Sequence, residues 1–304
     1  MKKQKLLLLF LLVTIAYALI VLLGPTAPST LAKYRLSQAK THLLSLTVVV
    51  PFVLIWLSAF YGYVTFKKYA VLVRDTDEGP ALTSISRGLG FLAFSLPVNS
   101  LISSFMGLLV IEHPSYLATT TIIRNYSAFI LPLLAFITIS RGAEMLVKLI
   151  KRRKKENLFH PSLWALGTII VTSLFSWLII VRPADTREAI NVYQLPNWLI
   201  ITTIVVPYLY IWFRGTLAAF YIISYQRNVT GKLYRQSLAY LSAGVFTVIL
   251  INILVALITT LSTRLYRLHL TPILIIVYIL VALYAVGFGL LASGAKKLKR
   301  IEEV

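Results

Sequence analysis

The sequence predicts an all-α, polytopic membrane protein with eight transmembrane helices, arranged as two parallel four-helix repeats. Two observations lead to this fold class, the composition and an internal repeat. The 304 residues are 58% hydrophobic and only 13% charged, with a mean hydropathy of +0.82, whereas a soluble domain carries about twice that charged fraction. Apolar runs of about 20 residues, the length that crosses a bilayer, recur along the chain. Because open strands would leave backbone groups unpaired in hydrocarbon, we expect these runs to be helices.

The internal repeat joins two proline-containing segments. The segment LTVVVPFVLIWL, with Pro51 and Trp56, recurs as TTIVVPYLYIWF, with Pro207 and Trp212. Corresponding residues differ by a constant 156 in number, and most pairs that are not identical exchange one apolar side chain for another. In a chain of this composition, such a copy predicts a duplicated bundle of membrane helices.

Each repeat contributes four predicted helices. The sequence places the eight helices at residues 6–23, 43–66, 88–111, 126–147, 163–181, 198–225, 238–261 and 272–295. The domains are then a first repeat at residues 1–150, a basic cytoplasmic linker at 151–161 and a second repeat at 162–304. Because four is an even number, the second repeat enters the membrane from the same side as the first. The two copies are therefore parallel and related by an axis along the membrane normal.

The first predicted helix has a competing interpretation as a secretory signal. The start MKKQK followed by an apolar run is typical of such signals. The run is long for a signal, however, and no small-residue cleavage site follows it cleanly. Its counterpart, the fifth helix SLWALGTIIVTSLFSWLIIV, lies in the middle of the chain and cannot be a signal. We therefore expect the first helix to be retained.

The second and sixth helices carry the matched prolines and tryptophans. Pro51 and Pro207 each remove a backbone hydrogen bond and are expected to kink their helices. The matched kinks are either a shared inherited bend or a hinge beside a cavity. Trp56 and Trp212 follow five residues later, and they either pack against aromatic neighbours or form a platform for a ligand.

Arg214, also in the sixth helix, is the sharpest candidate for a functional polar group. It is expected slightly to the cytoplasmic side of the bilayer centre, where a guanidinium costs several kcal/mol unless it finds partners. Its repeat counterpart is Ser58, so this charge belongs to one half only. Two interpretations are open. The guanidinium bonds backbone carbonyls or reaches the headgroups, or it contacts an anion or a lipid phosphate in a cavity.

The third and seventh helices each contain a deep asparagine, Asn99 and Asn252, at positions that correspond to within one residue. A buried amide needs hydrogen-bond partners. The duplicated amide therefore predicts a shared polar layer, made either by hydrogen bonds between helices or by a polar substrate site near the repeat axis.

The fourth and eighth helices match as LLAFITISRG and LVALYAVGFG. The fourth contains Arg141 and Glu144, which are three residues apart and therefore share a helix face. A structural role and a functional role are both open for this pair. The eighth carries Ala285, Gly289 and Ser293 at four-residue spacing, a stripe of small residues that lets helices approach closely in lipid.

The net charge of +20 has a location that argues against nucleic acid as a partner. Nineteen of the 30 lysines and arginines fall on one side of the predicted spans and eight on the other. Positive charge in short loops marks the cytoplasmic side, so both termini are expected in the cytoplasm and the protein in the cytoplasmic (plasma) membrane. One basic run, a candidate contact for anionic lipid headgroups, contains Lys148, Lys151, Arg152, Arg153, Lys154 and Lys155.

Residues for known catalytic chemistry are missing from the predicted spans. The chain has no cysteine, and its four histidines fall at helix ends or in loops. The sequence contains no zinc-protease motif and no phosphate-binding loop. Apart from Glu144, the predicted spans carry no carboxylate, so they lack paired carboxylates for acid–base catalysis. We expect no cofactor, no metal and no enzymatic activity.

Three functional classes remain. The first is a non-catalytic membrane subunit, scaffold or sensor that works through a protein partner or through homo-oligomers, and the lack of catalytic groups favours it. The second is a carrier, flippase or channel-like protein for an anionic or lipidic substrate, favoured by the repeat and by Arg214. The third, an intramembrane enzyme, would have to use Ser, Tyr or Arg alone.

Overall fold

A computed structural model describes residues 2–23, 38–112, 117–153, 206–265 and 270–302. Within these residues the secondary structure is helical, and no strand occurs in the described part of the chain. The helices are α1 (Lys2–Leu23), α3 (Gln38–Leu72), α4 (Gly79–Glu112), α5 (Leu117–Arg153), α9 (Val206–Arg227), α10 (Lys232–Leu265) and α11 (Leu270–Glu302).

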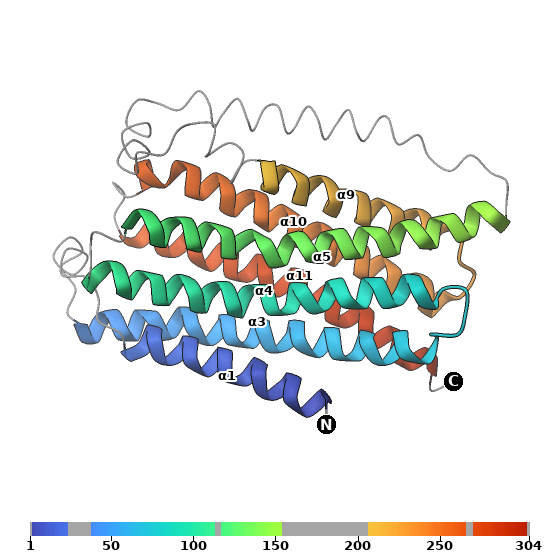
Figure 1. The fold of residues 1–304 in the computed structure, drawn as a ribbon, viewed down its shortest axis with the longest axis horizontal. Coiled ribbons are helices and arrows are strands. Elements are labelled where there is room, and N and C mark those ends of the chain that lie inside the picture. Colours follow the sequence, from blue (N-terminus) through green and yellow to red (C-terminus); the bar gives the residue numbers. More distant parts are fainter. Residues whose placement is uncertain (1, 24–37, 113–116, 154–205, 266–269, 303–304) are drawn as a thin grey trace.

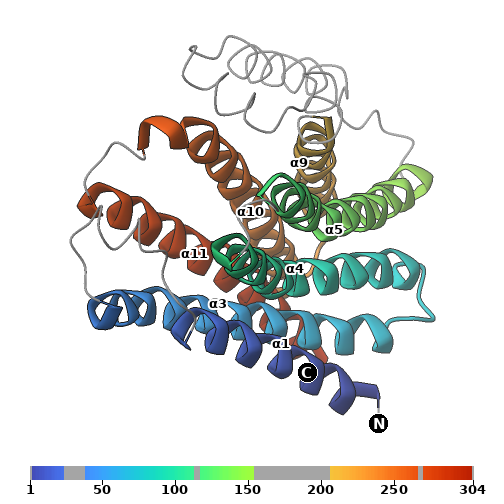
Figure 2. The same ribbon diagram turned by 60° about the vertical axis from the view of Figure 1, so that its left-hand side comes forward.

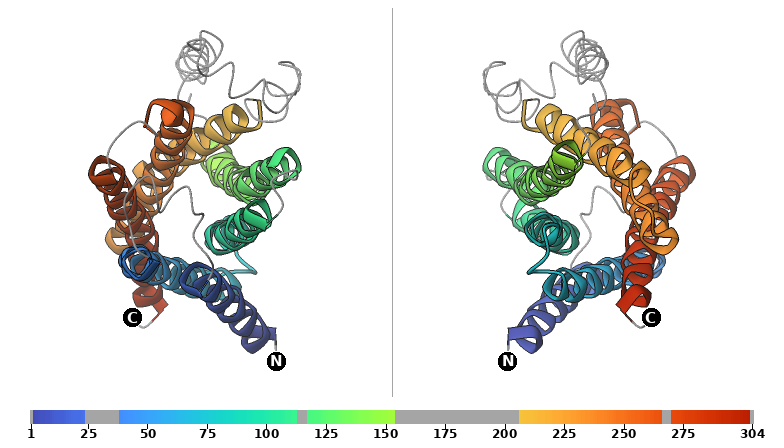
Figure 3. Two further views of the ribbon diagram at one scale, coloured as in Figure 1. Left: turned by 90° about the vertical axis from the view of Figure 1, so that its left-hand side faces the viewer. Right: turned by 90° about the vertical axis from the view of Figure 1, so that its right-hand side faces the viewer.

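Six of these helices form a closed ring around a common long axis (Figures 1 and 3). Following the ring, α3 packs on α4, α4 on α5, α5 on α9, α9 on α10, α10 on α11, and α11 returns to α3. Figure 2 shows α4 between α3 and α5. The first helix, α1, lies outside the ring against α3 and α4. The contact between α11 and α3 joins the first and the last helix of the ring.

The helices extend well past the predicted membrane spans. The α3 helix has 35 residues and α4 has 34, because no residue stops the helix where the apolar run ends. Thus α3 continues through Lys67 and Lys68 and ends at Leu72. A tight turn follows, in which the Val73 amide donates to the Tyr69 carbonyl at 3.1 Å.

Within the described residues, five helices are long and apolar enough to cross a membrane. These spans are Ser45–Leu72, Gly79–Met106, Ile130–Ile150, Lys232–Leu254 and Ile275–Leu298. Helix α1 contributes a shorter apolar helix, Leu7–Val21. The predicted fifth helix at 163–181 and residues 154–161 of the predicted linker lie outside the described residues. The structure thus supports a multi-pass, membrane-embedded protein, and the count of eight spans remains a prediction.

The outer face of the bundle is apolar, as a surface in contact with lipid must be. On α3 the exposed large side chains recur every three or four residues and therefore share one face: Leu43, Leu46, Val50, Leu54, Leu57 and Tyr61. Tyr278, Ile279 and Val286 are likewise exposed on α11. These exposed apolar faces agree with the composition in favouring a bilayer as the surrounding medium.

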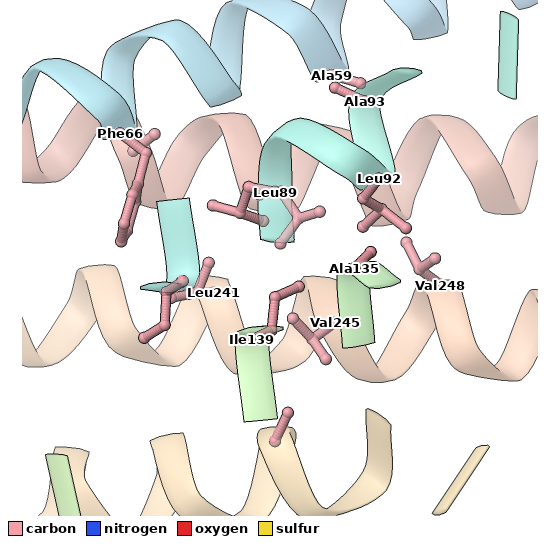
Figure 4. Packing of buried hydrophobic residues seen from close by; sticks show 14 of the residues in the cluster. Ala59, Phe66, Leu89, Leu92, Ala93, Ala135, Ile139, Leu241, Val245 and Val248 are labelled. Carbon is pink, nitrogen blue, oxygen red and sulfur yellow. The ribbon is translucent and has the colours of Figure 1, made fainter. Parts of the chain in front are cut away.

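One continuous apolar core joins all seven described helices. Figure 4 shows how side chains such as Phe66 of α3, Leu89 of α4, Ile139 of α5 and Val245 of α10 converge between the ribbons. Each of these four side chains is buried. Since lipid tails are as apolar as these residues, close van der Waals packing rather than escape from water holds such helices together.

Glycines allow the closest approaches within the ring. A Cβ atom on Gly142 of α5 would lie 2.6 Å from the Ala81 carbonyl oxygen of α4, and one on Gly294 of α11 would lie 3.0 Å from the Ser237 carbonyl oxygen of α10. Any larger residue at these sites would push the backbones of the paired helices apart. Glycine therefore allows close backbone contact in both the α4–α5 and the α10–α11 pair.

Candidate functional site

A cluster of polar side chains lies at the end of the bundle where α3 and α9 end and α4 and α10 begin. We call this the basic end, because exposed cations gather there: Lys67, Lys68, Arg74, Lys148, Arg227, Lys232, Arg235 and Lys296. The cluster is centred on Glu78, in the turn before α4. Both of its carboxylate oxygens accept hydrogen bonds. The Tyr225 hydroxyl of α9 donates to Oε1, and the Tyr234 hydroxyl of α10 donates to Oε2 at 2.7 Å.

Two tyrosines bind this carboxylate, and a third packs against one of them. The Tyr225 and Tyr234 rings meet edge to face, with their centroids 6.3 Å apart. The Tyr69 ring of α3 lies 6.5 Å from that of Tyr234. Tyr69 and Tyr225 are buried, and Glu78 is half-buried. The sequence analysis did not single out this cluster. A signal for it was available in the spacing of the residues. Tyr69 and Tyr225 are 156 residues apart, which is the repeat spacing, and so are Glu78 and Tyr234.

Arg214 lies in α9 and is half-buried. The next residue, Gly215, faces Ile249 of α10 and Phe136 of α5. The Arg214 Nε atom is buried and lacks a hydrogen-bond partner in the described part of the chain. A buried donor without an acceptor is costly. This atom is therefore the best-defined place in the described spans where an anionic or carbonyl oxygen would be stabilised.

The two asparagines occupy the same place in helices of equal length. Asn99 and Asn252 each lie 20 residues after the first residue of α4 and α10, and both helices have 34 residues. Both asparagines are half-buried. The Asn252 amide donates to the Val248 carbonyl of its own helix at 2.8 Å, which is a structural role. A shared polar layer between the two remains a prediction.

Glu144 interacts with a lysine of its own helix. Its carboxylate pairs with Lys148, one turn further along α5, with 2.7 Å between Nζ and Oε1. Arg141 is exposed. A glutamate four residues before a lysine is a favourable arrangement on a helix surface, and an exposed pair of this kind contributes little to stability. The contacts of Glu144 are therefore those of a helix end rather than of a buried site.

The tryptophans pack against other aromatic rings. Trp56 is fully buried, and its ring meets that of Tyr17 from α1 edge to face at 4.9 Å. The Trp212 ring lies 6.3 Å from that of Tyr208. Of the matched prolines, Pro51 lies inside α3, which continues through it, whereas Pro207 is the second residue of the described α9. The backbone before Pro207 lies outside the described residues, so the predicted second kink is not described.

Two serines that the sequence analysis did not single out connect helices directly. The Ser84 hydroxyl of α4 donates to the Thr138 carbonyl of α5 at 2.8 Å, and the Ser237 hydroxyl of α10 donates to the Gly294 carbonyl of α11 at 2.7 Å. The sequence alignment of the last helices placed Thr138 opposite Ala285. The two hydrogen bonds end at Thr138 and at Gly294, and the alignment of the last helices stays a prediction.

The described residues offer little for metal binding and part of the basic run predicted to bind lipid. The described residues contain no group of three or more histidines and carboxylates that could hold a metal ion. Of the predicted lipid-binding run, Lys148 is described and exposed, while Lys154 and Lys155 lie outside the described residues.

A scan against protein-family models gives no match, and searches of curated proteins and of solved structures give none either.

Proposed function

We propose that this chain is a non-catalytic integral membrane subunit, a scaffold or sensor that presents its outer faces to a protein partner or to a second copy. The observation that carries this proposal is the continuous apolar core, which reaches all seven described helices. The described interfaces are closed by apolar side chains and by glycines against backbone. Tight packing of this kind favours a fixed platform over a transport pathway.

The proposal includes the repeat architecture, two parallel four-helix units in the cytoplasmic membrane with both termini in the cytoplasm. The order of contacts supports it. The triplet α3, α4, α5 and the triplet α9, α10, α11 pack internally in the same order, and the contacts of α5 with α9 and of α11 with α3 close the ring. The paired serines add to this support, since Ser84 and Ser237 each lie five residues after the start of their helices.

A carrier or flippase for an anionic or lipidic substrate is the second candidate. The specific observation in its favour is the buried Arg214 Nε atom, which lacks an acceptor in the described part of the chain. A substrate phosphate or carboxylate would supply that acceptor. The lipid leaflet would interact with the exposed cations of the basic end in either case.

Reconstitution into lipid vesicles separates the two candidates. We expect vesicles that contain the protein to show no faster movement of labelled anionic phospholipid, or of inorganic phosphate, than vesicles without it. Arg214→Ala and the matched control Arg141→Ala, an exposed position on α5, are expected to behave identically. If the wild type moves phospholipid or phosphate rapidly, and this activity is lost in Arg214→Ala and retained in Arg141→Ala, the scaffold proposal is wrong and the carrier proposal is supported.

A further inference from the structure

We propose that Tyr69, Glu78, Tyr225 and Tyr234 form a latch that fastens the α3–α5 triplet to the α9–α11 triplet at the basic end of the ring. Release of this latch would let the two triplets separate at that end while the rest of the ring stays closed. The proposal rests on the contacts of these four residues and is independent of the scaffold or carrier assignment.

The position of the cluster in the ring is the first argument. Along the ring, α4 packs on α3 and α5, whereas α10 packs on α9 and α11. The bonds from Tyr225 and Tyr234 to Glu78 therefore cross the ring instead of following it. They link the turn that precedes α4, in the first triplet, to the end of α9 and the start of α10, which are neighbours in the second triplet.

The chemistry of the cluster is the second argument. An ionised carboxylate is a pure acceptor and a phenol is a good donor, so one carboxylate can bind two tyrosines without a competing donor. Hydrogen bonds to a charged group are about twice as strong as neutral ones. Burial of the Tyr225 ring strengthens them further, because the local dielectric constant is low. Half-burial of Glu78 leaves its carboxylate within reach of water, which can replace the phenols when the latch opens.

The asymmetry of the cluster is the third argument. Glu78 and Tyr234 are separated by 156 residues, the repeat spacing, and so are Tyr69 and Tyr225. Four tyrosines would make a symmetric cluster without a strong acceptor. With a carboxylate at one of the four positions, the first triplet supplies the acceptor and the second triplet supplies the two donors that bind it, Tyr225 and Tyr234. Both hydrogen bonds therefore join one triplet to the other.

The test uses the absence of cysteine from the chain. Asp75→Cys, in the turn before α4, and Thr230→Cys, in the turn before α10, are exposed sites for a pair of spin labels. In lipid nanodiscs, pulsed electron resonance is expected to give one narrow distance for the otherwise unchanged protein. Adding Tyr225→Phe and Tyr234→Phe removes both hydroxyls and keeps the rings, and a second population at longer distance is expected to appear.

The matched control is Tyr240→Phe, which removes a hydroxyl from an exposed ring of α10 outside the cluster. It is expected to keep the single narrow distance. Glu78→Gln, which retains one acceptor oxygen, should give a smaller share of the longer population than the double phenylalanine variant. An unchanged distance distribution in the double variant, with an unchanged unfolding temperature, would overturn the latch. Because the readout is a distance, its failure says nothing about transport.

Discussion

The two helix triplets of the ring reach the same order of packing with different residues. Each helix of the first triplet has a proline in its interior, Pro51 in α3, Pro97 in α4 and Pro132 in α5. The helices α10 and α11 have none in their interiors, and α11 instead carries Gly287 and Gly294 at its contacts with α10. The order in which the helices pack therefore does not depend on proline kinks. Close approach at small residues is the feature that both triplets share.

The two triplets also differ in how tightly their glycines are enclosed. A Cβ atom on Gly88 of α4 would lie 2.7 Å from the Ala135 carbonyl oxygen, which belongs to the backbone of α5. One on Gly244 of α10 would lie 2.7 Å from the flexible Leu291 side chain of α11 and 3.0 Å from the Gly287 carbonyl oxygen. The backbone of the partner helix therefore lies closer to Gly88 than to Gly244, and backbone cannot move aside as a side chain can.

The largest expected effect comes from enlarging these glycines. Gly88→Ala should destabilise the fold by about 1–3 kcal/mol, because the added methyl group overpacks a backbone contact. Gly244→Ala should destabilise the fold less than Gly88→Ala, because the Leu291 side chain can adopt another rotamer. Unfolding temperatures in detergent measure both. Gly289→Ala is the control, because nothing lies within 4 Å of its Cβ position, and a loss as large as that of Gly88→Ala would contradict the packing argument.

A medium effect is expected from the paired serines. Removing one hydrogen bond between membrane helices costs about 0.6 kcal/mol on average and up to about 1.7 kcal/mol. Ser237→Ala should lower the free energy of unfolding more than Ser84→Ala within this range, because Ser237 is buried and Ser84 is half-buried. Ser242→Ala is the control, since that hydroxyl bonds the Ala239 carbonyl of its own helix. Equal losses in all three variants would show that the contact between helices has no special value.

The smallest expected effect concerns the ends of α5 and α11. Glu144→Gln removes the exposed pair with Lys148 and should cost about 0.3–0.5 kcal/mol, falling further at high salt because exposed charges are screened. The other triplet places Lys297 against the Gln236 amide oxygen at 2.7 Å. Gln236→Ala should therefore show a loss with little dependence on salt. Thermal melts at low and high salt compare the two, and equal salt dependence would remove this distinction between the triplets.

The residues singled out from the sequence differ in how far their surroundings could be anticipated. Asn99 and Asn252 lie at equal distances from the starts of α4 and α10, and the polar layer that they would share stays a prediction. The partner of Glu144 was not anticipated, since two cations lie within one turn of it on the same helix. Arg214 was recognised as unusual from its depth alone. Its unbonded Nε atom is a property of packing that no spacing predicts.

The composition is enough to indicate that this protein is helical and membrane-embedded, because a chain this apolar can satisfy its backbone in lipid only within helices. The constant spacing of matched residues also predicts a duplicated unit, and that duplication stays a prediction. The packing of α11 on α3, and the position of Glu78 between Tyr225 and Tyr234, are seen only in the tertiary structure. The sequence does not predict them because uniformly apolar helices can pack against one another in many ways. The choice among them depends on shape, on glycines that meet backbone, and on a few hydrogen bonds between distant residues.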